Sequence, residues 1–352
     1  MFNKKLISAP PKFYLRKKYA GLSKFTLVLF ILFYIYSNHS IAGQPQKNND
    51  NKKSDIFSTR EIILPNYQSD SLKQDLPIES MILDKKNVLW MVGRTSVWRW
   101  QLNTNQLQRI NLLKQTEKDQ LRKIISFKSS LVVMSNQKLF QITFDPVKLI
   151  KLKSSNPKIV SLNIAADSSN IFWLTTGGIY AADFEQQTLI HMNQTPALYS
   201  QDITSFIPEN GSLWLLRGKK LFLRSLISNQ IQSKLLLSTK NKLQNIHSID
   251  DNIFVHTKYA VLRYKNNGEL RQRIPVEGNR KLVLMSLNKR SHLYLFSDKL
   301  LEIFDLKNEK SYHYRLNIGI VKKARGLLNR DSTVALITDG RPRAFQLSGD
   351  FW

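Results

Sequence analysis

Lysine and arginine residues recur in the short polar turns of this sequence, where side chains are expected to face solvent. They stand at comparable places in a repeated pattern of apolar segments, and the third repeat, with residues 175–178 at that place, lacks one. These candidate residues are Arg94, Lys138, Lys219, Lys220, Lys258, Lys299 and Arg341. Ammonium and guanidinium groups bind carboxylates and phosphates through charge-assisted hydrogen bonds. The pattern predicts a ring of cations that binds an anionic partner.

The sequence as a whole is strongly basic, with a formal net charge of +27. The first 42 residues hold seven of the cations and no acidic residue, so the rest of the chain keeps a charge of +20. The turns on the side of the candidate cations are strongly positive, whereas the alternate turns are slightly negative. Such a field favours an anionic polymer, a lipid headgroup or an acidic protein patch as partner. The alternative is a lysine-rich composition that only keeps the protein soluble.

Other kinds of chemistry find little support in the residues. There is no cysteine, which excludes disulfide bonds, thiolate nucleophiles and zinc–thiolate sites. The histidines show no metal-ligand spacing, and no phosphate loop, dinucleotide fingerprint or Gly-x-Ser-x-Gly turn is present. His256 falls in a predicted turn, where it would face a ligand or solvent. We therefore expect no catalytic residue, no metal and no cofactor.

The elements that would position the cations follow from a regular repeat. Short apolar segments recur every 40 to 42 residues, with centres at Trp90, Val132, Trp173, Trp214, Phe254, Tyr294 and Ala335. A period of this length accommodates four short strands with their turns, which is one β-propeller blade. The sequence predicts an all-β fold, a seven-bladed β-propeller of four-stranded antiparallel blades. The tryptophans in the segments, including Trp98 and Trp100, are expected to pack in the core.

The third repeat shows the expected blade most clearly. Its strands are predicted at residues 159–165, 171–174, 179–182 and 188–193, with turns of Asp, Asn, Ser and Gly between them. The last repeat lacks an obvious fourth strand, while residues 59–64 form a spare strand ahead of the first repeat. Placing this N-terminal strand on the last blade closes the ring and removes an exposed sheet edge.

The N-terminal segment has the pattern of an export signal. A basic stretch without acidic residues precedes an apolar run at residues 25–36, and small residues stand at Ser40 and Ala42. We expect a signal peptide over 1–42, a flexible polar linker over 43–57 and the propeller over 58–352. The protein would then be periplasmic or secreted. The alternative is an uncleaved signal anchor in the inner membrane.

Three segments carry a resemblance to a known repeat. They are residues 87–91 (Asn-Val-Leu-Trp-Met), 212–215 (Ser-Leu-Trp-Leu) and 170–179 (Asn-Ile-Phe-Trp-Leu-Thr-Thr-Gly-Gly-Ile). This pattern resembles the two-component regulator propeller repeat, with a degenerate motif in the second, fifth, sixth and seventh repeats. The resemblance covers residues 59–352 and implies an extracytoplasmic sensor-type β-propeller. The sequence contains no kinase segment, so we expect a partner to relay any signal.

Three functions are compatible with these observations. The first is a monomeric, non-enzymatic exported scaffold whose basic face docks an anionic partner. The second is a small-ligand sensor that acts through a membrane-bound signalling protein. The third is a propeller lactonase or lyase, which would need acids or histidines converging on the axis. We rank them in this order, because the charge pattern is visible in the sequence and a convergent catalytic cluster is not.

Overall fold

The computed structural model divides the chain into two units, Met1–Asp55 and Ile56–Trp352. The structure describes residues 59–64, 70–114, 118–144, 148–153, 159–192, 203–209, 211–225, 233–249, 251–276, 284–287, 292–297, 300–315, 324–330 and 332–347. The predicted signal peptide, the predicted linker and the candidate Lys299 lie outside the described residues.

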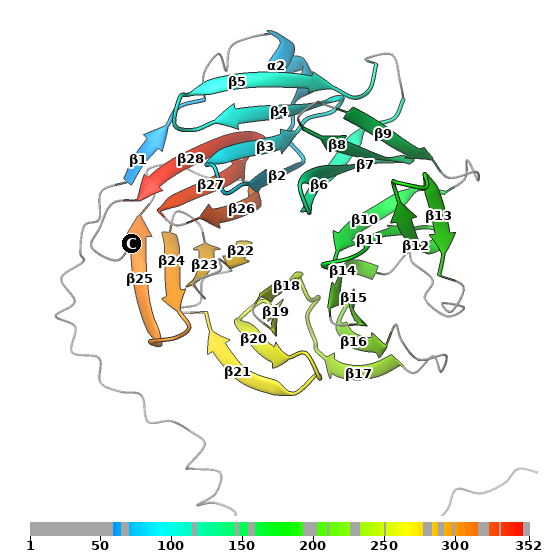
Figure 1. The fold of residues 1–352 in the computed structure, drawn as a ribbon. Helices are drawn as coiled ribbons and strands as arrows, with labels where there is room; N and C mark the ends of the chain where they lie inside the picture. Colours follow the sequence, from blue (N-terminus) through cyan, green and yellow to red (C-terminus); the bar gives the residue numbers. More distant parts are fainter. Residues whose placement is uncertain are drawn as a thin grey trace, which may run out of the picture. The chain divides into compact units, whose positions relative to one another are not determined.

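Seven four-stranded antiparallel sheets form the blades of a β-propeller, as predicted (Figure 1). Blade 1 holds β2 (Ser80–Leu83), β3 (Val88–Val92), β4 (Ser96–Gln101) and β5 (Gln106–Asn111). Blade 2 holds β6 (Leu121–Phe127), β7 (Ser130–Ser135), β8 (Lys138–Thr143) and β9 (Lys148–Lys153). Blade 3 holds β10 (Ser161–Ala166), β11 (Ile171–Thr175), β12 (Gly178–Asp183) and β13 (Thr188–His191), which match the predicted strands to within two residues.

The remaining blades repeat this order. Blade 4 holds β14 (Ile203–Glu209), β15 (Ser212–Arg217), β16 (Lys220–Ser225) and β17 (Ser233–Ser238). Blade 5 holds β18 (Asn245–Ile249), β19 (Asn252–His256), β20 (Ala260–Lys265) and β21 (Leu270–Pro275). Blade 6 holds β22 (Leu284–Leu287), β23 (His292–Ser297), β24 (Leu300–Asp305) and β25 (Lys310–Arg315).

Blade 7 joins the two ends of the propeller. Its strands β26 (Ala324–Arg330), β27 (Thr333–Thr338) and β28 (Arg341–Leu347) are completed by the N-terminal β1 (Thr59–Ile62). Strand β1 pairs antiparallel with β28, from Thr59 opposite Leu347 to Ile62 opposite Ala344. Glu61 of β1 accepts two hydrogen bonds of 2.6 Å from the Arg343 guanidinium of β28. The predicted closure is confirmed, and it covers the edge that β28 would otherwise expose.

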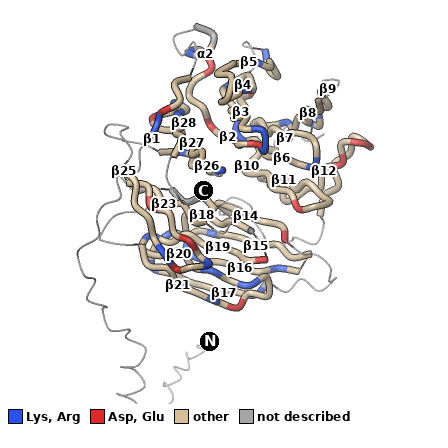
Figure 2. The backbone as a smooth tube through the Cα atoms, turned by 60° about the vertical axis from the view of Figure 1, so that its left-hand side comes forward, with Lys and Arg blue, Asp and Glu red and all other residues tan. Residues whose placement is uncertain are grey.

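The hydrophobic core lies between successive blades. The second strand of each blade is almost free of charged residues along its length (Figure 2). Trp90 packs in a cluster with Phe140 and Ile142 of blade 2, and Trp173 packs with Val132 of that blade. Trp100, Trp173 and Trp214 are fully buried. The tryptophans therefore occupy the core, as predicted, because their large apolar rings fill the space where two blades meet.

A short helix, α2 (Asp70–Asp75), was not foreseen from the sequence. Its Leu72 is fully buried in a cluster with Trp98 and Trp100 of blade 1. The carboxylate of Asp75 accepts hydrogen bonds from the indole Nε1 of Trp98 at 2.7 Å and from the amide and hydroxyl of Thr95 at 2.7 and 3.0 Å. The helix is fastened to blade 1 by these contacts rather than by its own length, which is too short for an independent helix.

Candidate binding face

In each blade we name the strands a to d from the innermost outward. Strand a runs to the a–b turn and strand b runs back, so the beginning of strand a and the b–c turn share one end of the blade. We call this end the b–c face. Six of the predicted cations lie at this end in the described residues, at or beside b–c turns. The sequence correctly assigned these residues to one set of turns, because the turn signals mark the strand ends.

A hydroxyl at the end of strand b shapes several b–c turns. Thr257 Oγ1 accepts a hydrogen bond of 3.0 Å from the amide of Ala260 and donates one of 2.8 Å to its carbonyl. Thr175 Oγ1 donates to the carbonyl of Gly178 at 3.0 Å, and Ser135 Oγ accepts from the amide of Lys138 at 2.9 Å. Such side-chain bonds replace backbone partners that a tight turn leaves unpaired. They hold the residues of the turn in place on the b–c face.

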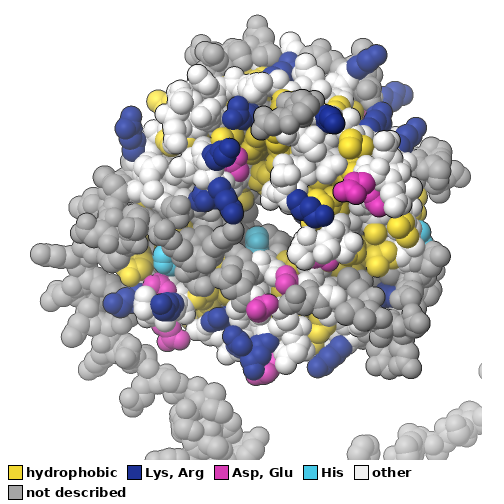
Figure 3. All heavy atoms as spheres, in the orientation of Figure 1, with side chains coloured by type: hydrophobic (Ala, Val, Ile, Leu, Met, Phe, Trp, Pro, Cys, Tyr) yellow, Lys and Arg dark blue, Asp and Glu magenta, His cyan; other side chains and the backbone are white. Residues whose placement is uncertain are grey.

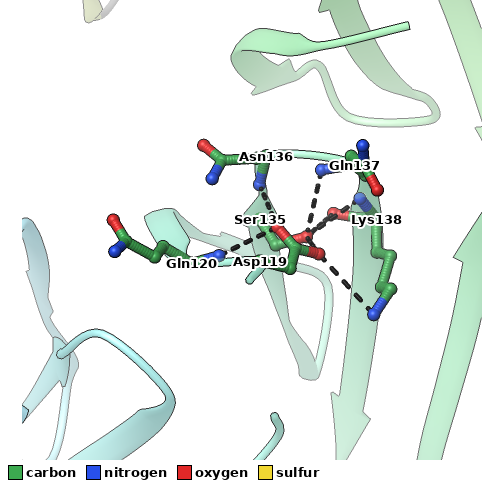
Figure 4. A network of polar contacts seen from close by, with 6 residues as sticks. All are labelled: Asp119, Gln120, Ser135, Asn136, Gln137 and Lys138. Atoms are coloured by element: carbon green, nitrogen blue, oxygen red, sulfur yellow. Dashed lines mark hydrogen bonds and ion pairs between the residues drawn. The ribbon is translucent and has the colours of Figure 1, made fainter. Parts of the chain in front are cut away.

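A carboxylate in the segment before strand a of blade 2 contacts the b–c turn of that blade and balances one of the predicted cations (Figure 4). Asp119 accepts hydrogen bonds from Ser135 Oγ at 2.7 Å and from the amides of Gln120 and Asn136, each at 2.9 Å. The Lys138 ammonium lies 3.7 Å from Asp119 Oδ2, and both side chains are largely buried. Lys138 therefore offers a partner less charge than the ring predicted from the sequence would require.

The other predicted cations differ in their exposure. Arg94, Lys219, Lys220 and Arg341 are exposed. Lys258 is half-buried, and its ammonium lies 4.7 Å from the ring centre of Tyr259, within the range of a cation–π contact. Among the described members of the set, the exposed ones lie in blades 1, 4 and 7.

Among the described residues of the b–c face, blade 4 carries four exposed lysines on two neighbouring segments. Thr239 donates from its amide to the carbonyl of Lys219 at 3.0 Å, and Leu243 donates to the carbonyl of Gly218 at 3.0 Å. These bonds bring the segment after strand d beside the b–c turn. The exposed lysines of the two segments, which we call the blade 4 lysine cluster, are Lys219, Lys220, Lys240 and Lys242. The described residues 211–225 and 233–249 contain no acidic residue to neutralise them.

The innermost strands carry a second feature that sequence reasoning missed. Strands β6, β10, β14 and β26 each have a β-bulge near their beginning, at Arg122, Leu162, Thr204 and Arg325. All four bulged residues are exposed although they belong to the strands nearest the central opening. Bulges turn a side chain out of the regular alternation and are common beside functional sites. No short sequence signal marks them, because the register shift depends on pairing with strand b.

Lys123 follows the first of these bulges and connects two blades. Its ammonium donates hydrogen bonds to Asn163 Oδ1 at 2.5 Å and to the carbonyl of Ile164 at 2.8 Å, both on β10. Burial lowers the pKa of Lys123 to about 8, because water no longer stabilises the charged form. A second polar contact joins blade 7 to blade 1, because Arg325 of β26 forms an ion pair of 2.8 Å with Glu79, the residue before β2.

His256 is not in a turn, contrary to the expectation from the sequence. It is the last residue of β19, it is only 1% exposed, and its Nε2 has no hydrogen-bond partner among the described residues. Burial, assisted by His247, lowers the pKa of His256 to about 4. A buried neutral imidazole at this place belongs to the core of blade 5 and does not face a ligand.

Two other features, a metal-binding group and a membrane-spanning helix, are absent from the described residues. No three histidine, aspartate or glutamate side chains in the described part lie together as a metal-binding group. Within the same part, no helix is long and apolar enough to cross a membrane. Figure 3 shows an opening at the centre of the ring, bordered by lysine and arginine side chains as well as carboxylates.

Comparison with known proteins supports the fold and leaves the family open. No family model and no curated protein matches the chain. A catalytically inactive virginiamycin B lyase from Staphylococcus aureus, solved with quinupristin, shares 12% sequence identity at a TM-score of 0.65, over 83% of this chain and 100% of that one. At this level of identity the likeness shows the propeller fold alone.

Two extracellular sensor domains of B. thetaiotaomicron have the same architecture. The domain from the hybrid two component system BT3049 shares 14% identity at a TM-score of 0.56, over 77% of this chain and 40% of that one. The domain from the one component system BT4673 shares 10% identity at a TM-score of 0.57, over 82% of this chain and 40% of that one. Sensor domains of this kind are thus among the structural neighbours of the chain. Membership of the two-component regulator propeller family stays a prediction.

Proposed function

We propose that the protein is a non-enzymatic, exported β-propeller that binds an anionic partner through the b–c face. The blade 4 lysine cluster is the observation that carries this proposal. Its four ammonium groups are exposed, lie on two hydrogen-bonded segments and have no acidic residue in those segments. Several cations held close together attract a polyanion more strongly than the same charges dispersed over the surface, because their fields add.

The anionic partner is an anionic polymer, a lipid headgroup layer or an acidic protein patch. Export is supported by the basic and apolar pattern of residues 1–42. Extracellular sensor domains among the structural neighbours are consistent with a propeller that works outside the cytoplasm. Because a lyase is also among those neighbours, an enzymatic function is the alternative that an experiment has to exclude.

Binding across a salt series tests this function. We expect the protein to bind heparin, duplex DNA or anionic vesicles with an affinity that falls steeply as salt rises. On duplex DNA the slope of log affinity against log salt is about −0.9 for each phosphate neutralised. The triple variant K219S/K220S/K240S should flatten this slope by about 2 to 3 units.

A matched control separates the cluster from the general charge. The variant K85S/K86S/K307S removes the same charge from exposed lysines at turns of the opposite end of the blades. We expect it to keep most of the affinity and slope of the unchanged protein. Equal losses in the two triple variants would show that total charge matters and that the cluster does not.

A small-ligand sensor that acts through a membrane-bound signalling partner is the second candidate. The specific observation in its favour is the set of repeated bulges, which expose side chains from the innermost strands beside the central opening. This function predicts saturable binding of a small molecule with little dependence on salt. Binding of such a ligand by a protein that ignores every polyanion would favour the sensor over the scaffold.

A further inference from the structure

One pair of bulges brings a cation and an apolar side chain to the same turn. Asn136, in the b–c turn of blade 2, accepts a hydrogen bond of 2.8 Å at Oδ1 from Arg122 Nε. The carbonyl of the same residue accepts a hydrogen bond of 2.7 Å from the amide of Ser161, which immediately precedes Leu162. The turn therefore contacts both bulged segments, through the Arg122 side chain in blade 2 and through the backbone of Ser161 in blade 3.

The guanidinium of Arg122 is oriented but not saturated. Its Nε bond to Asn136 is its one polar contact within the described residues, so both terminal nitrogens remain available. Two parallel N–H donors match the two oxygens of a carboxylate, and a guanidinium held in advance loses less entropy on binding. Two other cations near the beginning of inner strands differ, since Arg325 is paired with Glu79 and Lys123 is bonded to Asn163.

The surroundings specify the rest of the ligand. Leu162 is 37% exposed and offers an apolar surface in the segment of blade 3 that the same turn contacts. Asp119 contacts the backbone of the same Asn136, but its carboxylate is engaged by Ser135, by two amides and by the Lys138 ammonium. Its repulsion of an incoming anion is reduced by these partners.

We propose that Arg122, Asn136 and Leu162 form a binding site for a small monocarboxylate with a short apolar chain. The carboxylate binds the two terminal nitrogens of Arg122, and the chain lies against Leu162. This inference rests on the small-ligand sensor function and names its ligand class. It is independent of the blade 4 lysine cluster, so the failure of either site leaves the other testable.

Isothermal titration with acetate, butyrate and inorganic phosphate tests the site on the purified full-length protein. We expect saturable binding of butyrate, weaker binding of acetate and the weakest binding of phosphate. The variant R122Q should weaken butyrate by about tenfold, the effect of losing one bidentate ion contact. The variant L162S should weaken butyrate and leave acetate unchanged.

The variant K85Q is the control, because Lys85 is an exposed cation at a turn of the opposite end of the blades. It should bind butyrate as the unchanged protein does, and circular dichroism should show that all three variants stay folded. The proposal is overturned by equal butyrate binding in R122Q, by phosphate binding more tightly than butyrate, or by no saturable binding at 50 mM ligand, about the limit of such a titration.

Discussion

Equivalent residues in the seven blades show how burial acts on a single side chain. One position of strand b pairs with the strand a residue that follows the bulge in blades 2, 3, 4 and 7, and with the first residue of strand a in blades 1, 5 and 6. The residues at this position are Val92, Met134, Leu174, Leu216, His256, Phe296 and Ile337. All of them are buried, and His256 alone among them is polar. Burial at this position leaves the imidazole Nε2 of His256 without a hydrogen-bond partner among the described residues and lowers the pKa of the ring.

The pKa of His256 predicts a loss of stability in acid. The unfolded chain binds a proton at about pH 6.5, and the folded chain binds it only near pH 4. Between these values the unfolded state holds more protons, so stability falls as the pH drops from 6.5 toward 4, by up to about 3 kcal/mol. Urea unfolding at several pH values measures this loss.

The variant H256L places at this position the residue that blades 3 and 4 carry there. It should remove the part of the pH dependence between 4 and 6.5, while H191Q, a change at an exposed histidine, should retain it. An unaltered pH profile in H256L would assign the acid sensitivity to other groups.

At the scale of elements, the b–c turn is the unit that presents side chains to a partner. Its geometry depends on the hydroxyl at the end of strand b and on the contacts that fasten it to the next blade. Gly93 stands at the equivalent position in blade 1, where a Cβ would come within 2.6 Å of the Asp75 carboxyl carbon. Glycine is required here because α2 packs directly against the end of β3.

A substitution at Thr257 isolates the contribution of the turn hydroxyl. The variant T257V keeps the shape of the side chain but leaves the amide of Ala260 without its acceptor, which should cost about 1 kcal/mol of unfolding free energy. The variant T257S keeps the hydroxyl and should cost less. Urea unfolding compares the two, and equal destabilisation would mean that the methyl group, rather than the hydrogen bonds, stabilises the turn.

At the scale of the whole molecule, the ring is held closed by β1 on β28. Strand β1 completes blade 7 and the chain that follows it forms blade 1, so the pairing of β1 with β28 is the junction at which the ring can open. The two hydrogen bonds between Arg343 and Glu61 add a charged contact to the strand pairing at that junction. A partner bound across several blades would depend on this closure.

Charge reversal tests the junction. The variant R343E places two carboxylates opposite each other and should lower the free energy of unfolding by about 1 kcal/mol, because both side chains are partly exposed to screening solvent. The double variant E61R/R343E restores opposite charges and should recover most of the loss. Thermal and urea unfolding measure both, and no recovery in the double variant would show that the ion pair does not contribute to closure.

The repeat, the strand positions and the closing strand were predictable from the sequence, because they depend on local alternation of apolar residues and on turn residues. The burial of the tryptophans followed from the same pattern. The pairing of Lys138 with Asp119, the burial of His256 and the contacts of Asn136 with the bulged segments of two blades were not predictable. Each depends on strand register or on contacts between segments far apart in the chain, and only the tertiary structure determines those distances.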